Sequence, residues 1–187
     1  MLRMLTSFFM VIALMAQVNA KEVNNVEIAD SIQVSEQLLV LNGVGVRSKF
    51  FLDLYVGALY SSKKSTDGDA LILADETMTI RLYVTSSFID GERMSEATLD
   101  GFVKSTSGNL APIQQEIELL LAVFRDAVDD KDVFDLQYVP NQGVSVIRNG
   151  DLKILVPGLE FKQALFGIWL SDDPVQEDLK KGMLGEA

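Results

Sequence analysis

Polar and apolar residues alternate most regularly between residues 77 and 84. Met78, Ile80 and Leu82 fall on one side of this segment, and mostly polar residues fall on the other. A period of two residues predicts a β-strand with one buried face. Residues 50–60 are apolar on both sides, which predicts a strand buried on both faces. Other segments rich in strand-forming residues are 32–34, 37–46, 133–139, 144–148 and 152–156.

Apolar residues at helical spacing predict helices over residues 90–104, 111–128, 159–170 and 173–184, and a helical turn near 70–74. Asp90 stands where an N-cap residue is expected for the first of these helices. The last helix is expected to begin with Asp173 as N-cap, Pro174 at the first helical position and Gln176 at the third, which is the spacing of a capping box.

The order of these elements predicts the fold class. Strands come first, then two helices, then a run of strands joined by the hairpin signal Asn149-Gly150, then two more helices. This order indicates a single α+β domain around an antiparallel sheet, in contrast to the regular strand–helix alternation of a Rossmann-like fold.

The first 20 residues have the features of a signal peptide. Arg3 supplies a positive charge, residues 8–16 are apolar, and Val18 and Ala20 place small side chains before a cleavage site. We therefore expect a signal peptide over 1–20, one folded domain over 21–187, and export to the periplasm without a stable membrane anchor. An uncleaved anchor or a buried helix is the alternative interpretation.

The composition removes several classes of chemistry. The 187 residues include no His and no Cys, which excludes imidazole bases, thiolate nucleophiles, disulfides and Cys-based metal sites. The formal net charge of −11 argues against nucleic acid and anionic lipid surfaces as partners, because binding phosphates requires clustered Lys and Arg. We expect no metal and no cofactor. Any activity has to depend on Arg, Lys, hydroxyl groups, carboxylates or the backbone.

Arg47 is the most informative candidate residue. If the glycines do not shift the strand register, alternation places Arg47 on the same face as Leu39 and Leu41. On the next strand Asp53 and Tyr55 then share a face. A buried Arg requires an anionic partner. This partner is either Asp53, which would make a structural ion pair, or the carboxylate of a ligand.

Three other groups of residues are interpreted as structural. The acidic residues at 126–132 and at 172–173 lack the spacing of a calcium loop and are interpreted as solvated loop charges and N-caps. Phe166 and Trp169 have the spacing of a core helix. The glycines 43, 45 and 57 do not form a nucleotide-binding motif, because no helix follows in the required place.

Two segments of the chain resemble the chalcone isomerase-like family, and specifically its exported bacterial branch. The first is Leu41-Asn42-Gly43-Val44-Gly45-Val46-Arg47-Ser48-Lys49-Phe50-Phe51 with the following Tyr55-Val56-Gly57-Ala58-Leu59-Tyr60, and the second is Phe161–Leu170 with Asp173-Pro174. The resemblance implies an open-faced β-sandwich, in which a large antiparallel sheet carries helices on one face with a cleft between them.

The resemblance also implies a ligand site that comprises Arg47, Tyr55, Arg81 and Lys49. Plant members of the family cyclise chalcones, and related plastid proteins bind fatty acids through an Arg and a Tyr. The plant enzymes carry a Tyr and an Asn at the start of the helix after the third strand, and residues 88–96 contain neither. We therefore expect a non-catalytic domain that binds a small hydrophobic carboxylate such as a fatty acid.

Two alternative functions stay open at this point. One is an intramolecular lyase of the chalcone isomerase type that acts on a polyphenol-like enone, with Arg47 as its catalytic residue. The other is a scaffold or accessory protein of the cell envelope whose cleft is filled by its own side chains.

Overall fold

The structure is a computed structural model that describes residues 20–126 and 128–186. Residues 1–19, and with them nearly all of the expected signal peptide, lie outside the described residues. In the part of the chain that is described, no helix combines the length and the apolar character needed to cross a membrane.

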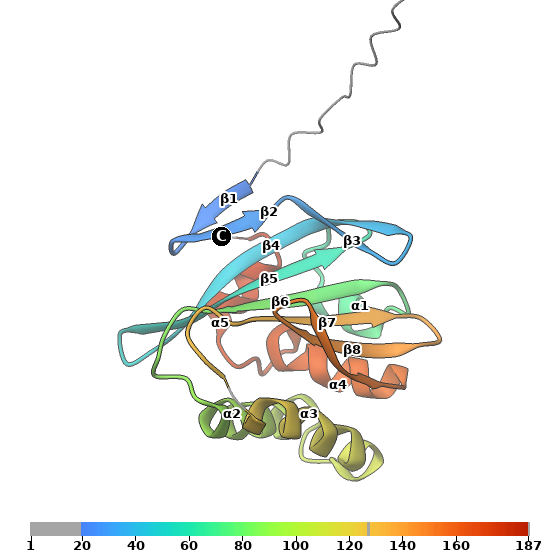
Figure 1. Cartoon of the computed structure of the whole chain (residues 1–187). Coiled ribbons are helices and arrows are strands. Elements are labelled where there is room, and N and C mark those ends of the chain that lie inside the picture. Colours follow the sequence, from blue (N-terminus) through green and yellow to red (C-terminus); the bar gives the residue numbers. More distant parts are fainter. Residues whose placement is uncertain (1–19, 127, 187) are drawn as a thin grey trace, which may run out of the picture.

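A seven-stranded antiparallel sheet forms the centre of the molecule (Figure 1). Each strand pairs with its neighbour in the sequence, so the sheet is a meander that runs from β3 to β9. Its strands are β3 (Ser31–Val34), β4 (Gln37–Lys49), β5 (Leu52–Ser61), β6 (Met78–Val84), β7 (Val133–Val139), β8 (Gly143–Arg148) and β9 (Asp151–Val156). The sheet and the helices on one of its faces confirm the α+β, open-faced architecture expected from the sequence.

The helices lie together on one face of the sheet (Figure 1). They are α1 (Gly68–Leu73), α2 (Gly91–Ser105), α3 (Gln114–Asp126, preceded by a 3-10 turn at Ala111–Ile113), α4 (Leu159–Leu170) and α5 (Glu177–Met183). The side chain of Asp90 accepts a hydrogen bond from the Arg93 backbone N–H at 2.9 Å, which confirms Asp90 as the N-cap of α2.

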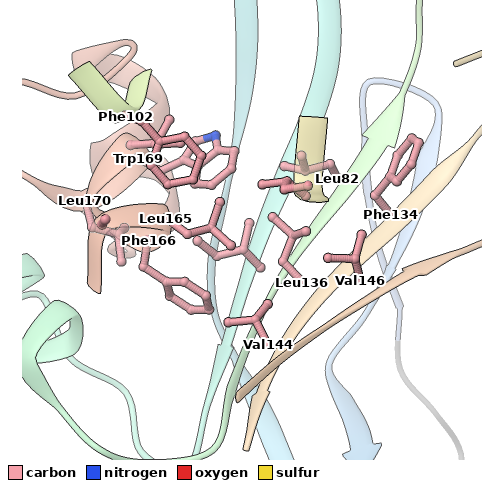
Figure 2. Close-up of a cluster of buried hydrophobic side chains, with 14 of the residues drawn as sticks. Leu82, Phe102, Phe134, Leu136, Val144, Val146, Leu165, Phe166, Trp169 and Leu170 are labelled. Atoms are coloured by element: carbon pink, nitrogen blue, oxygen red, sulfur yellow. The ribbon is translucent and has the colours of Figure 1, made fainter. Parts of the chain in front are cut away.

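The main core lies between α4 and the sheet. Helix α4 is apolar almost all round, as expected for a helix covered on every side. Figure 2 shows Leu165, Phe166 and Trp169 on the face of α4 that lies toward the sheet. They belong to the same apolar cluster as Leu136 and Val144 of the strands. Helix α2 packs against α4 on the side away from the sheet (Figure 1), so α4 is enclosed between α2 and the sheet, whereas α3 packs against α2 and strand β9.

A β-hairpin covers part of the opposite face of the sheet. Strands β1 (Ala20–Val23) and β2 (Val26–Ala29) are joined by Asn24 and Asn25, both with positive φ. Beneath this hairpin a second apolar cluster includes Ile28 and Val56, and the Tyr60 hydroxyl donates a hydrogen bond to the Ala29 carbonyl at 3.0 Å. The mixed polar pattern of residues 21–36 predicted only a short strand near 32–34, so this hairpin was not foreseen.

Two β-bulges change the faces on which key residues lie. Leu41 is opposite Tyr60 while Gly43 is opposite Leu59, so Asn42 is an extra residue in β4. The side chain of Arg47 consequently lies on the helix-covered face, opposite to that of Leu41. The two residues were expected to share a face only if the register did not shift, and this condition is not met, because the register shifts between Leu41 and Gly43.

The second bulge separates Asp53 from Tyr55. Arg47 is opposite Tyr55 and Ser48 is opposite Asp53, which leaves Leu54 as the extra residue in β5. Tyr55 joins the main core, whereas Asp53 lies on the hairpin side of the sheet with Tyr83. The prediction that Asp53 and Tyr55 share a face is wrong.

The expected start of the last helix is corrected by three residues. Helix α5 begins at Glu177, and Gln176 is the residue that precedes it. Asp173 is not an N-cap; instead its carboxylate accepts a hydrogen bond from Lys104 Nζ at 2.7 Å. The capping-box spacing fails because the side chain of Gln176 binds elsewhere, at Arg47.

The acidic run at 126–132 is only partly solvated. Asp132 is buried and accepts hydrogen bonds from the backbone N–H of Asp129 at 2.8 Å and the amide of Asn149 at 2.7 Å, and it forms an ion pair with Arg148 at 2.6 Å. Burial raises the pKa of Asp132, but these three interactions outweigh it and hold the pKa below its usual value. Asp132 therefore fixes the loop before β7, which corrects its interpretation as a solvated charge.

Candidate functional site

A cavity of about 410 Å³ opens at one end of the helix-covered face. This volume lies within the range of roughly 300–1,000 Å³ that is typical of small-molecule sites. Its walls come from the ends of β4 and β5, the first turns of α2, the end of α4, and the segment before α5. The residues around it are Arg47, Lys49, Phe50, Leu52, Leu54, Tyr55, Phe88, Ile89, Arg93, Met94, Glu96, Ala97, Thr98, Asp100, Ile168, Trp169 and Val175.

Arg47 and Tyr55 face each other across the strand pair that forms one wall. They are direct partners in the β4–β5 register, and both line the cavity. The indole Nε1 of Trp169 donates a hydrogen bond to the Tyr55 hydroxyl at 3.0 Å. Among the described residues, no group accepts the proton of the Tyr55 hydroxyl, so that proton is available to an acceptor on a ligand.

The hydroxyl of Tyr55 stays protonated at neutral pH. Burial raises its pKa, and the hydrogen bond from Trp169 and the charge of Arg47 only partly oppose this effect. Tyr55 thus acts as a neutral hydrogen-bond donor, and the charge of this wall comes from Arg47.

The side chain of Gln176 holds Arg47 in place. Its Oε1 accepts hydrogen bonds from Arg47 Nη1 and from the Ser48 backbone N–H, each at 2.9 Å. Arg47 Nη1 also donates to the Ser48 carbonyl at 3.0 Å. Both acceptors are uncharged, so they orient the guanidinium without neutralising it.

No internal carboxylate neutralises Arg47 within the part of the chain that the structure describes. Asp53, the expected partner, lies on the other face of the sheet and accepts a hydrogen bond from the Ser48 hydroxyl at 2.7 Å. Of the two interpretations that the sequence left open, the structural Arg47–Asp53 ion pair is therefore excluded. A positive group at the wall of an apolar cavity favours an anionic ligand group.

The other two expected site residues lie in different places. Lys49 lines the mouth of the cavity, and its Nζ lies 5.5 Å from the centre of the Phe50 ring. Arg81 does not line the cavity. It lies on the hairpin side of the sheet, where its Nη2 donates to Asp135 at 3.0 Å and its guanidinium lies over the Tyr60 ring.

The ligand-binding role of Arg47, Tyr55 and Lys49 stays a prediction, and the geometry leaves Arg81 outside the site. The pattern of alternation in β6 already placed Arg81 opposite the apolar face of that strand.

Sequence reasoning missed two polar contributors to the site. Trp169 was interpreted as a core residue, and it is one, but its N–H also binds Tyr55. Gln176 was assigned to a capping box. No sequence signal identifies Gln176, because its contact with Arg47 joins residues 129 positions apart.

The comparisons with known proteins agree with this architecture. A family model described as chalcone isomerase-like matches residues 20–185. A crystal structure of a fatty-acid binding protein from Arabidopsis thaliana superposes with a TM-score of 0.69 at 17% sequence identity, covering 89% of this chain and 95% of the plant chain. A search of curated proteins finds no significant match.

Proposed function

Because this chain belongs to the chalcone isomerase-like family, we propose that it binds a small hydrophobic carboxylate, such as a fatty acid, in the cavity at Arg47 and does not catalyse a reaction. The observation that carries this proposal is the guanidinium of Arg47 at the wall of a mainly apolar cavity, beside the hydroxyl of Tyr55. Within the described part of the chain, no carboxylate neutralises this guanidinium and no group accepts the hydroxyl proton.

The site offers separate places for the two ends of such a ligand. Arg47 and Tyr55 supply a charged and a neutral donor for the carboxylate, and a hydrogen bond between two charged groups is stronger than a neutral one. Leu54, Ile89 and Ile168 supply apolar surface for the tail. Each buried methylene then contributes about 0.8 kcal/mol to binding.

Three further observations support the proposed binding role. The loop before α2 contributes Phe88 and Ile89 to the wall and the first turn of α2 contributes Met94, so the Tyr and Asn of the plant enzymes have no counterpart there. The cavity is also open, whereas a scaffold protein was expected to fill it with its own side chains. The plant protein of similar fold is described as a fatty-acid binding protein, which supports the same ligand class.

Trp169 provides a direct measurement of binding. It is the only tryptophan in the sequence and it lines the cavity, so its fluorescence reports on ligand with no competing signal. We expect dodecanoate to change this fluorescence in a saturable manner. Arg47→Met should weaken the binding by about tenfold or more, because the carboxylate loses its charged partner.

Arg93→Met is the matched control. Arg93 also lines the cavity, but it is exposed and forms an ion pair with Asp90 at 2.9 Å, so we expect less than about a threefold change for an exposed and internally paired charge. Dodecanol should bind the native protein more weakly than dodecanoate. Equal binding of dodecanoate to the native protein and to Arg47→Met would contradict the proposed role of Arg47.

We further propose that the protein is an exported member of the family, with residues 1–20 as its signal peptide and the periplasm as its location. The support is the pattern of Arg3, the apolar run and Ala20. Intact mass measurement of the protein from a periplasmic extract should give a chain that begins at Lys21. A chain that retains residues 1–20 in the cytoplasmic fraction would contradict export.

A further inference from the structure

The turn between β4 and β5 carries two aromatic side chains that are exposed to solvent. Phe50 is 82% exposed and Phe51 is 106% exposed, although both are large apolar residues. Their φ angles are +52° and +66°. Such two-residue hairpin turns strongly favour Asn and Gly, because other side chains are strained in the left-handed region. Neither burial nor backbone geometry therefore explains phenylalanine at these two positions.

This turn adjoins the mouth of the cavity. Phe50, Leu52 and Lys49 line the mouth from the strand side, and Phe88, which is also exposed, lines it from the loop before α2. Figure 1 shows the β4–β5 turn projecting beyond the helices at the left of the view. The exposed rings are thus continuous with the apolar lining of the cavity.

We propose that Phe50 and Phe51 insert into the surface of a lipid bilayer with zwitterionic headgroups and bring the mouth of the cavity against the lipid. Two rings at the end of a hairpin form a narrow apolar projection, whereas a stable protein partner requires a complementary surface of roughly 800 Å² on each side. Exposed aromatic side chains beside an open apolar cavity mark an interaction site, and aromatic rings are favoured at the bilayer interface.

Charge specifies the type of bilayer. Lys49 lies next to the rings, where its ammonium is placed to meet a headgroup phosphate. The chain as a whole has a net charge of −11, which repels an anionic surface. The contact therefore depends on apolar insertion and is reversible, because two side chains provide far less membrane affinity than a spanning helix.

The role that we assign to this bilayer contact rests on the proposed function, the binding of a hydrophobic carboxylate. A hydrophobic carboxylate resides mainly in membranes, and a cavity that opens onto the bilayer receives or releases it without passage through water. The contact itself does not depend on the ligand, so the two ideas are tested by separate measurements on the same preparations.

Flotation with phosphatidylcholine vesicles tests the contact. We expect the native protein to float with the vesicles and Phe51→Gly to lower the partition coefficient by about tenfold, in line with the loss of one buried aromatic side chain. The double variant Phe50→Asn/Phe51→Gly should abolish flotation. Both variants place preferred residues in a turn with positive φ, so their thermal stability should be equal to or higher than that of the native protein.

Leu152→Ser is the matched control. Leu152 is exposed on the edge strand β9 and does not line the cavity, so its replacement should leave flotation unchanged. The side chain of Phe51 also does not line the cavity, so Phe51→Gly should bind dodecanoate as the native protein does.

Each outcome bears on one of the two ideas. No flotation of the native protein, equal flotation of Phe51→Gly, or flotation that requires added phosphatidylglycerol would overturn the bilayer contact. Concentration-dependent self-association that Phe51→Gly abolishes, measured without vesicles by sedimentation velocity, would overturn it in favour of a contact between two copies. Flotation that is lost in Phe51→Gly supports the contact even when dodecanoate fails to bind, a result that contradicts only the proposed ligand.

Discussion

Replacement of Lys162 by methionine is expected to lower the free energy of unfolding by about 3–5 kcal/mol, because it leaves three backbone carbonyls without a donor at a cost of about 1–3 kcal/mol each. Lys162 lies in α4 and is completely buried. Its Nζ donates hydrogen bonds to the carbonyls of Leu71, Ile72 and Ala74 at 2.7–2.8 Å. These carbonyls end helix α1, where no further backbone N–H is available to them.

The charged form of Lys162 fits this site. Burial lowers its pKa to about 8, while the attraction of Asp75 and Glu76 opposes that effect. The side chain is therefore mainly protonated at neutral pH, and its three N–H groups match the three carbonyls. Methionine fills a similar volume but donates no hydrogen bond, so it leaves the buried carbonyls unpaired, which is the costly outcome for polar groups in a core.

Urea denaturation followed by Trp169 fluorescence measures this loss. Lys63→Met is a suitable control, because Lys63 is exposed in the loop before α1 and its replacement should change stability by less than about 0.5 kcal/mol. A decrease in the free energy of unfolding of under about 1 kcal/mol for Lys162→Met would contradict this prediction, because one ordinary hydrogen bond contributes about that much. Such a result would show that the carbonyls at the end of α1 find other hydrogen-bond donors.

Gly43→Ala is expected to have a comparably large effect, lowering the free energy of unfolding by about 3 kcal/mol or more. A Cβ atom at this position would lie 2.3 Å from the Gly182 carbonyl oxygen and 2.6 Å from the Met183 carbonyl oxygen. Both are backbone atoms of α5, so no side chain can move aside. The whole helix has to shift away from β4 to make room.

This shift should also weaken ligand binding. Asn42, the bulge residue beside Gly43, donates hydrogen bonds to the carbonyls of Ser65 and Met183 at 3.0 and 2.9 Å, which fixes the end of α5. The residue before α5 is Gln176, which orients Arg47. A displaced α5 therefore releases the guanidinium, and dodecanoate affinity should fall together with stability.

Gly57→Ala is the matched control for this prediction. Gly57 lies on the next strand under the same helix, but the nearest atoms to its added Cβ all belong to side chains: Leu179 Cδ1 at 3.3 Å, Met183 Sδ at 3.4 Å and Leu82 Cδ2 at 3.8 Å. These ends are flexible, so we expect a change of about 1 kcal/mol or less. Equal effects of Gly43→Ala and Gly57→Ala in urea denaturation would refute the importance of the backbone contact.

Regular patterns in the sequence were sufficient to predict most of the helices and strands. The alternation at 77–84, the apolar spacing of α2, α3 and α4 and the Asn149-Gly150 turn each depend on neighbouring residues, and the structure places them within a few residues of the expected bounds. The β1–β2 hairpin escaped this reasoning, because its mixed residues acquire a buried face only by packing on the sheet.

The candidate site was predictable in its chemistry but less so in its geometry. Arg47, Lys49 and Tyr55 line one cavity and Arg81 does not, while their role in ligand binding stays a prediction. The side chain that orients Arg47 is Gln176, which comes from the far end of the chain. Local spacing contains no information about a contact of that kind.

The sequence by itself determined the α+β class, the antiparallel strands, and a chemistry without His or Cys, because these follow from composition and from periodicities of two or 3.6 residues. Only the tertiary structure decided that Arg47 lies on the helix-covered face and has no carboxylate partner among residues 20–126 and 128–186. The physical reason is the bulge at Asn42: one extra residue turns every following side chain of β4 to the other face. That bulge is held by the carbonyls of Ser65 and Met183, which the fold alone brings to it.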